Sequence, residues 1–123
     1  MSDVSRKALG QLEAEVLAAL ARRGGEAGTA ELLPQLDADL AYTTVNTVLF
    51  RLYEKKLVTR VRAGRHYRYR LAVDESELVA CRMRDHLRHA SDPGGVLSRF
   101  VRTLTAAEER KLREILSGLD EPR

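Results

Sequence analysis

Positively charged side chains are concentrated in one short stretch of this sequence. Between Tyr42 and Arg70 there are eight Lys or Arg residues and one acid, Glu54, whereas the whole 123-residue chain has a formal net charge of only +3. The eight are Arg51, Lys55, Lys56, Arg60, Arg62, Arg65, Arg68 and Arg70. Cations gathered in this way attract a polyanion and release its counterions on contact. The pattern therefore predicts that one face of the molecule meets a nucleic acid.

The first half of this stretch has the period of an amphipathic helix. Its apolar stripe consists of Val45, Val48, Leu49 and Leu52, which must face a core. The opposite face carries Thr43, Thr47, Arg51 and Glu54, flanked by Thr44 and Phe50. Hydroxyls pair with several base edges, Arg favours guanine and apolar atoms meet thymine methyls, so this face suits a DNA major groove. A solvated helix face is the alternative. We also expect Thr43 or a neighbour to cap the helix.

From Leu57 onward the apolar period becomes that of a strand. The apolar members of the alternation are Thr59, Val61, Ala63, Tyr67, Tyr69 and Leu71. The residues between them are Arg60, Arg62, His66, Arg68 and Arg70. The pattern predicts two strands around a turn at Ala63-Gly64-Arg65, where Gly64 can take a positive φ. One face of this hairpin would be aromatic, and the other would hold at least four arginines that phosphates neutralise.

These two elements supply the candidate DNA-binding residues. The base-reading candidates are Thr43, Thr44, Thr47 and Arg51, with Asn46 and Phe50 at the edges. The phosphate or minor-groove candidates are Tyr42, Lys55, Arg60, Arg62, Arg65, His66 and Arg68, around the turn residue Gly64. Tyr42 stands at the entrance of the helix, where it either contacts phosphate or plugs the turn.

Two earlier helices must hold the reading helix in place. Residues 8–23 read as a helix with Leu9, Leu12, Val16 and Leu20 on one stripe and Glu13 outside, ended by Gly24-Gly25. Thr29 is expected to be the N-cap of a second helix, which Pro34 should keep short or bent. The three helices together form a helix-turn-helix.

The sequence after Val73 has the pattern of three further helices. Residues 74–90 form the first, the breaker Ser91-Asp92-Pro93-Gly94-Gly95 follows, and a capping box at Thr105 and Glu108 starts the last. The apolar residues of this part are Leu78, Val79, Met83, Leu87, Val96, Leu97, Phe100, Val101, Leu104, Leu112, Ile115, Leu116 and Leu119. So short a segment cannot bury all of them alone, which predicts a two-fold symmetric homodimer. Such a dimer reads a palindrome with half-sites roughly 10 bp, or a multiple of that, apart.

The whole arrangement resembles the penicillinase-repressor family of winged-helix regulators. The resemblance rests on Leu9-Gly10-Gln11-Leu12-Glu13, on Ala41-Tyr42-Thr43-Thr44-Val45 with Leu52, and on Gly64-Arg65 with Tyr67-Arg68-Tyr69, and it covers residues 8–119. It implies a mainly α fold with a small β-hairpin, in which a winged helix-turn-helix is followed by a three-helix C-terminal dimerisation lobe. Domains of 1–73 and 74–123 are expected, and the chain would be a dimeric repressor of transcription.

The resemblance also implies a way of relieving repression. Members that respond to β-lactams are cut by a membrane-bound metalloprotease sensor before a phenylalanine of the penultimate helix, which here is the Arg99–Phe100 bond. Arg99 departs from the asparagine of staphylococcal-type members. The copper-responsive branch carries Cys-x-Cys pairs, and this chain has a single cysteine, Cys81.

Other functions find little support in the residue pattern. No grouping of Ser, His, Cys or carboxylates typical of an enzyme is present, and no cofactor is expected. Cys81, Asp85 and His89 share a helical stripe, which leaves a metal-sensing regulator as one alternative. A winged-helix module that docks an acidic protein is another. One cysteine and no long apolar run predict a cytoplasmic protein without membrane insertion.

Overall fold

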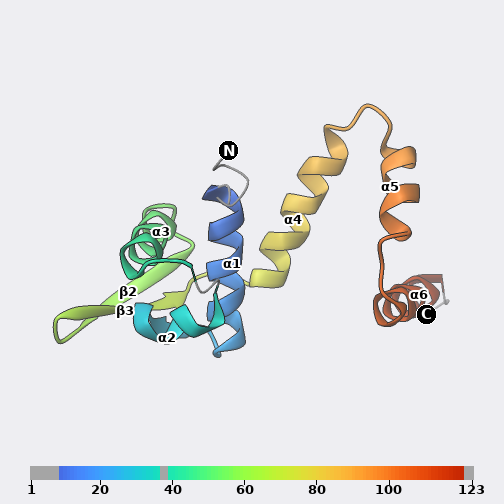
Figure 1. Cartoon of the computed structure of the whole chain (residues 1–123). Helices are drawn as coiled ribbons and strands as arrows, with labels where there is room; N and C mark the ends of the chain where they lie inside the picture. Colours follow the sequence, from blue (N-terminus) through green and yellow to red (C-terminus); the bar gives the residue numbers. More distant parts are fainter. Residues whose placement is uncertain (1–8, 37–38, 121–123) are drawn as a thin grey trace. The chain divides into compact units, whose positions relative to one another are not determined.

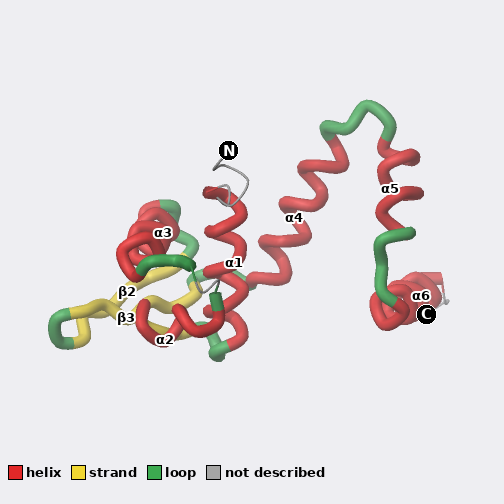
Figure 2. The backbone as a smooth tube through the Cα atoms, in the orientation of Figure 1, coloured by secondary structure: helices red, strands yellow, loops and turns green. Residues whose placement is uncertain are grey.

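The computed structural model describes residues 9–36 and 39–120. The chain divides into two compact units, Met1–Ala80 and Cys81–Arg123. In order, the elements are α1 (Leu9–Arg22), β1 (Glu26–Gly28), α2 (Thr29–Leu32), the 3₁₀ turn η2 (Leu33–Gln35), α3 (Tyr42–Glu54), β2 (Val58–Ala63), β3 (His66–Leu71), α4 (Glu75–Arg88), α5 (Pro93–Val101) and α6 (Ala106–Asp120) (Figures 1 and 2). Three helices followed by an antiparallel hairpin confirm the predicted winged helix-turn-helix, with three helices after it.

One hydrophobic core holds the first unit together. Its buried members are Leu12, Val16, Leu17, Ala19, Leu20, Ala27, Leu32, Val45, Val48, Leu49, Leu52, Val58 and Tyr69. The predicted stripe of α3 is entirely buried, and so are Leu12, Val16 and Leu20 of α1. Because each fully buried Leu or Val contributes about 1.5–3 kcal/mol, this core fixes how α3 lies against α1 and the sheet.

The ends of the two long helices of this unit share one geometry. Beyond the end of α1, Gly24 has φ of +81°, and the Gly25 amide donates to the Leu20 carbonyl at 2.8 Å. Beyond the end of α3, Lys56 has φ of +66°, and the Leu57 amide donates to the Leu52 carbonyl at 3.0 Å. Each helix is thus followed by a residue in the left-handed conformation, and the next amide donates to a carbonyl of the last helical turn. This arrangement satisfies carbonyl groups that have no partner within the helix. The chain therefore turns sharply out of α3 into the wing.

Both N-caps predicted for the first unit were wrong. Gly28, not Thr29, precedes α2, and its amide donates to Glu31 Oε1 at 2.8 Å. Ala41 precedes α3 without a side-chain cap, so Thr43 already lies inside the helix, where its carbonyl accepts from Thr47 Oγ1 at 2.9 Å. α2 is short, as Pro34 predicted, because the chain changes to a 3₁₀ turn there.

The wing is a three-stranded sheet in the order β1-β3-β2, and not the predicted two strands alone. β1 pairs antiparallel with β3, Ala27 opposite Tyr69. Its three residues are too few to show an alternation in the sequence. β2 and β3 form the hairpin, with Ala63 opposite His66, and it projects beyond the helices of its unit (Figure 1).

The C-terminal helices begin with side-chain caps. Asp74 Oδ1 accepts from the Ser76 amide at 2.9 Å, and Asp92 accepts from the Gly95 amide at 3.1 Å. The predicted capping box is confirmed, since the amides of Thr105 and Glu108 each bond to the other's side chain.

Two boundaries in this part differ from the expectation. The helix-breaking segment predicted at Ser91–Gly95 is shorter than expected. Pro93 to Gly95 already form the first turn of α5, where proline is favoured. Leu104 lies beyond the end of α5. α4 crosses the division between the two compact units, and the functional boundary between residues 73 and 74 stays a prediction. No helix in residues 9–36 and 39–120 is long and apolar enough to cross a membrane.

Candidate nucleic-acid interface

The outer face of α3 presents small polar groups, an arginine and an aromatic ring to solvent. The exposed base-reading candidates are Thr43, Thr44, Asn46, Thr47, Phe50 and Arg51, and Tyr42 at the start of the helix is half-buried. Phe50 is 42% exposed, so its ring can touch another molecule. The arrangement fits the chemistry expected of this face.

Asn46 is held by a neighbouring element. The buried Thr29 hydroxyl at the start of α2 donates to Asn46 Oδ1 at 2.6 Å. With its oxygen accepting this bond, the NH₂ group of the amide remains as a hydrogen-bond donor. Sequence reasoning placed Asn46 at the edge of the reading face and missed Thr29, because a contact across 17 residues leaves no periodic pattern.

The prediction for the two faces of the hairpin was wrong. The strands are joined by the two residues Gly64 and Arg65, so Arg60 lies opposite Tyr69 and Arg62 opposite Tyr67. Residues directly opposite in an antiparallel pair point to the same face. Arg60 and Arg62 therefore share a face with the tyrosines, and Val61, 64% exposed, shares the other with Arg68.

Arg60 lies against three aromatic rings. Its Cζ atom is 4.0 Å from the ring centroid of Tyr67, 4.3 Å from that of Tyr53 and 5.5 Å from that of Phe50. A hydrogen bond with the Tyr69 side chain raises the pKa of Arg60, and the neighbouring tyrosines add to that effect. The guanidinium thus connects α3, β2 and β3 by cation–π contacts.

Two other arginines of the wing have carboxylate partners inside the chain. Arg68 bonds Glu26 at 3.0 Å and Glu31 at 2.8 Å, and Arg70 bonds the other oxygen of Glu26 at 2.9 Å. The Arg70 and Arg68 hydrogen bonds lower the pKa of Glu26. The Gly28 amide, followed by Arg68, lowers the pKa of Glu31. Carboxylates of β1 and α2 therefore neutralise part of the charge that we assigned to phosphates alone.

Lys55 also has an internal partner. Its Nζ atom lies 2.8 and 2.9 Å from the two carboxylate oxygens of Glu13. Glu13 is only 3% exposed, so the prediction that it lies on the outside of α1 was wrong. A buried carboxylate needs such a cation, because desolvation of an unpaired charge is costly. Lys55 remains half-exposed and still adds positive potential beside α3.

The remaining cations surround the turn of the wing and the end of α3. Among the described residues, no ion pair involves Arg51, Lys56, Arg62 or Arg65. Gly64 has φ of +66°, at the first position of a two-residue turn, where glycine is favoured. Tyr42 Oη lies 3.3 Å from His66 Nδ1, so it links α3 to the wing. A hollow of about 280 Å³ separates α3 from the wing, and Asn46, Phe50 and Arg65 are among its lining.

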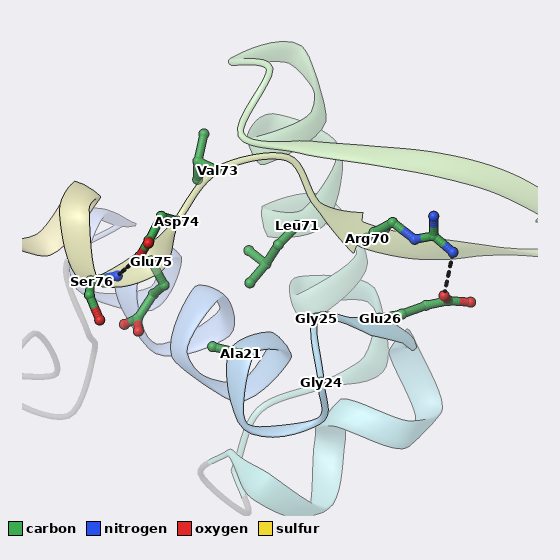
Figure 3. Close-up of a pocket in the computed structure, with 10 residues that line it drawn as sticks. All are labelled: Ala21, Gly24, Gly25, Glu26, Arg70, Leu71, Val73, Asp74, Glu75 and Ser76. Carbon is green, nitrogen blue, oxygen red and sulfur yellow. Dashed lines mark hydrogen bonds and ion pairs between the residues drawn. The ribbon is translucent and has the colours of Figure 1, made fainter.

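A second hollow of about 670 Å³ lies where the sheet meets the start of α4 (Figure 3). Two bonds join polar groups of its lining, one between Arg70 and Glu26 and one from the Ser76 amide to Asp74. Leu71 and the Gly24-Gly25 turn form its apolar side. We interpret this hollow as the joint between the wing and α4.

The predicted dimerisation residues are largely exposed. Leu78, Leu87, Leu104 and Leu112 are half-buried. The others, exposed in the chain, are Val79, Met83, Val96, Leu97, Phe100, Val101, Ile115, Leu116 and Leu119. Arg99 and Phe100, the predicted cleavage pair, lie in the last turns of α5, and Phe100 is 44% exposed.

The stripe of Cys81, Asp85 and His89 does not assemble a metal site. Asp85 bonds Arg88 at 2.6 Å, and His89 Nδ1 lies 2.8 Å from the Asp85 carbonyl oxygen. No group of three His, Cys, Asp or Glu side chains in the described part of the chain is placed to hold a metal ion. The structure therefore gives no support to the metal-sensing alternative.

Known proteins are similar to this chain in sequence and in fold. The family model described as penicillinase repressor matches residues 9–118. The transcriptional regulator BlaI of Mycobacterium tuberculosis, in strains CDC 1551 and H37Rv, is 40% identical over 117 residues, which cover 91% of this chain and 85% of that protein.

Two solved structures are also similar. The crystal structure of the organohalide-sensing transcriptional regulator RdhR-CbdbA1625 with 2,4-dichlorophenol has a TM-score of 0.53 at 17% identity, covering 90% of this chain. Our chain spans 65% of that longer chain, and this likeness concerns the fold alone. The solution structure of the DNA-binding domain of the repressor BlaI matches 55% of this chain and 83% of that domain at 26% identity, with a TM-score of 0.48.

Proposed function

The chain belongs to the penicillinase repressor family, and from this premise we propose that it is a dimeric, sequence-specific DNA-binding repressor of transcription in the cytoplasm. The observation that carries the proposal is the exposed face of α3, which presents hydroxyls, an amide and Arg51. Among the described residues no ion pair involves Arg51, or Arg62 and Arg65 of the wing. This combination suits a major groove flanked by phosphates. Members of the family are transcriptional regulators and not enzymes.

In the proposed complex α3 enters the major groove and the wing follows the backbone. Thr43, Thr44, Thr47 and Arg51 face base edges, with Asn46 as a donor and Phe50 as an apolar contact. Arg62, Arg65 and His66 are the wing groups best placed for phosphate, since they surround the exposed turn. Lys55, Arg60 and Arg68 were candidates for the same role, but each has partners within the chain, which makes their contribution smaller.

Dimerisation would come from the apolar stripes of α4, α5 and α6. Leu119 is 72% exposed, Met83 53% and Leu116 52%, and a second copy would cover such surface by two-fold symmetry. Two α3 helices would then read a palindromic operator, with half-sites roughly 10 bp or a multiple of that apart. Cleavage of Arg99–Phe100 by a membrane metalloprotease sensor would separate α6 from the rest and leave each half-site bound weakly.

Selection of bound sequences from a random duplex pool tests the proposal. We expect a two-fold symmetric site, recovered by a chain that sediments as a dimer. An asymmetric half-site would contradict the dimer. If random duplex DNA showed no affinity even at low salt, the basic face would be a protein-docking surface instead.

Two arginine substitutions separate base reading from backbone contact. Arg51→Ala should cost about 1–3 kcal/mol on the selected site and relax the preference at one base pair in each half-site. Arg65→Ala should weaken binding to all sequences alike and reduce the dependence on salt. Binding isotherms on matched and single-substituted duplexes at several salt concentrations measure both. Equal losses on every sequence would show that these roles are assigned wrongly.

A further inference from the structure

We propose that Arg60 is a positioning residue, whose guanidinium fixes the wing against α3 and thereby places Phe50 for base contact, and that it is not a phosphate ligand. This inference rests on the proposed DNA-binding function and adds a determinant of specificity to it. It departs from the simplest interpretation of an arginine in a basic wing, which is that its charge meets the backbone.

The first argument is where Arg60 points. In the hairpin register it lies opposite Tyr69, whose side chain is 3% exposed, so Arg60 leaves β2 on the face that packs against the core. It is itself only partly exposed, whereas Arg62 and Arg65, nearer the turn, are exposed. Its guanidinium lies over the rings of Tyr67, Tyr53 and Phe50, beside the hollow between α3 and the wing, so contacts within the chain hold it there and not at the exposed turn.

The second argument is what Arg60 touches. Tyr67 belongs to β3, while Tyr53 and Phe50 belong to α3, and all three ring centroids lie within 5.5 Å of Arg60 Cζ. Tyr53 and Phe50 also contact each other, with ring centroids 6.3 Å apart. A cation shared between rings of two elements resists a change in the distance between them.

The third argument is the consequence for recognition. Phe50 is an exposed aromatic residue of α3, and its ring borders the hollow between the helix and the wing. Arg65, on the turn of the wing, lines the same hollow. Base contacts by Phe50 and phosphate contacts by Arg65 therefore both depend on the distance between α3 and the wing. The contacts of Arg60 with the aromatic rings set this distance. Lysine would keep the charge but not the planar, weakly hydrated group that stacks on rings.

The experiment compares Arg60→Lys with Arg65→Ala in the full chain. Affinity is measured for the selected duplex and for a random duplex, each over a range of salt concentrations. For Arg60→Lys we expect affinity for the selected duplex to fall by about 3- to 30-fold, with little change on the random duplex and an unaltered salt slope. For Arg65→Ala we expect weaker binding to both duplexes and a salt slope smaller by about 0.9 for each phosphate that the protein no longer neutralises.

A second substitution guards against an effect on folding. Tyr67→Leu removes the nearest ring and should reduce the selected-to-random affinity ratio as Arg60→Lys does, and the double variant should be little weaker than either single one. Thermal unfolding of each variant shows whether the fold persists. A general loss of fold would lower both affinities together and so overturn the inference.

Other outcomes also overturn it. Wild-type affinity in Arg60→Lys would show that charge alone matters, and a reduced salt slope in Arg60→Met would show a phosphate contact. If the wild-type chain binds no duplex, the proposed function fails first and this inference fails with it. If the wild type binds and only the Arg60 results disagree, the inference alone fails.

Discussion

The two units of this chain contain similar amphipathic helices with opposite degrees of burial. All thirteen buried apolar residues of the described chain lie in the first unit, between Leu12 and Tyr69. No residue of α4, α5 or α6 whose exposure is described is buried, although each helix has a full apolar stripe. The difference lies in the layers available, because a sheet and three helices can enclose a core, whereas a few helices of 9 to 15 residues cannot. The first unit is stabilised by its own core, whereas the apolar stripes of the second stay exposed in the single chain, and the proposed dimer would cover them.

Matched leucine-to-alanine substitutions in the two units test this difference in burial most directly. Leu49→Ala removes a fully buried side chain and should lower the free energy of unfolding by about 2–5 kcal/mol. Leu116→Ala removes one that is 52% exposed and should change the stability of a dilute monomer by less than about 1 kcal/mol. Urea unfolding at low protein concentration measures both.

The same pair should behave in the opposite way in assembly. Sedimentation over a range of concentrations should show weaker self-association for Leu116→Ala and wild-type association for the folded fraction of Leu49→Ala. Equal effects of the two substitutions on monomer stability would mean that the second unit has a core of its own.

The next largest effect concerns the buried carboxylate of the first unit. Lys55→Met leaves Glu13 without its cation and should cost about 1–2 kcal/mol, a value reduced from that of a fully buried pair because Lys55 is half-exposed. Chemical denaturation measures this destabilisation. Glu13→Gln in the Lys55→Met background should recover part of it, while a reduced salt slope of DNA binding would instead reveal a phosphate contact by Lys55.

A smaller effect is expected at a helix start of the second unit. Asp92 accepts a hydrogen bond from the Gly95 amide at the beginning of α5, so Asp92→Ala should cost about 1 kcal/mol. Ser91→Ala, beside it and also exposed, is the control and should stay within about 0.5 kcal/mol. Thermal unfolding followed by circular dichroism compares them. Equal melting of the two variants would show that this hydrogen bond does not stabilise α5.

The smallest effect is the response to acid, and it belongs to the first unit. Hydrogen bonds from arginines and from a backbone amide lower the pKa values of Glu26 and Glu31 below the usual 4.5. Their contribution to stability is therefore complete above pH 4.5 and is lost as the pH falls through the lowered values. The midpoint of thermal unfolding should fall over that interval, and less so in a Glu26→Gln, Glu31→Gln variant. An identical acid profile in the variant would refute the assignment.

Periodicity predicted the helices of this protein well, since stripes such as Val45, Val48, Leu49 and Leu52 state which side is buried. It failed at the hairpin for a definite reason. Alternation gives the two faces of one strand, but the relation between two strands depends on the length of the turn. A three-residue turn at 63–65 would place Arg60 opposite Arg68 on the neighbouring strand. The observed two-residue turn places Arg60 opposite Tyr69, and therefore on the same face as that ring.

Long-range polar contacts were the other part that sequence could not provide. Glu13 and Lys55 are 42 residues apart, as are Glu26 and Arg68. Each looks like an ordinary surface charge in its own helix or strand. Only the packing of α1 on α3, and of β1 on β3, brings them together. The residues of the candidate interface stay a prediction from the sequence, and the structure adds which of its cations have internal partners.

The strand order has one further consequence, for the behaviour of the protein in concentrated solution. β2 pairs only with β3 in the described sheet, so its second side offers free backbone donors and acceptors to any other strand. Val61 stands on this exposed margin. Such a strand is a site for aggregation, and neighbouring arginines oppose it by mutual repulsion between molecules. The positive charge of the wing therefore also opposes aggregation through the edge of β2 while no DNA is bound.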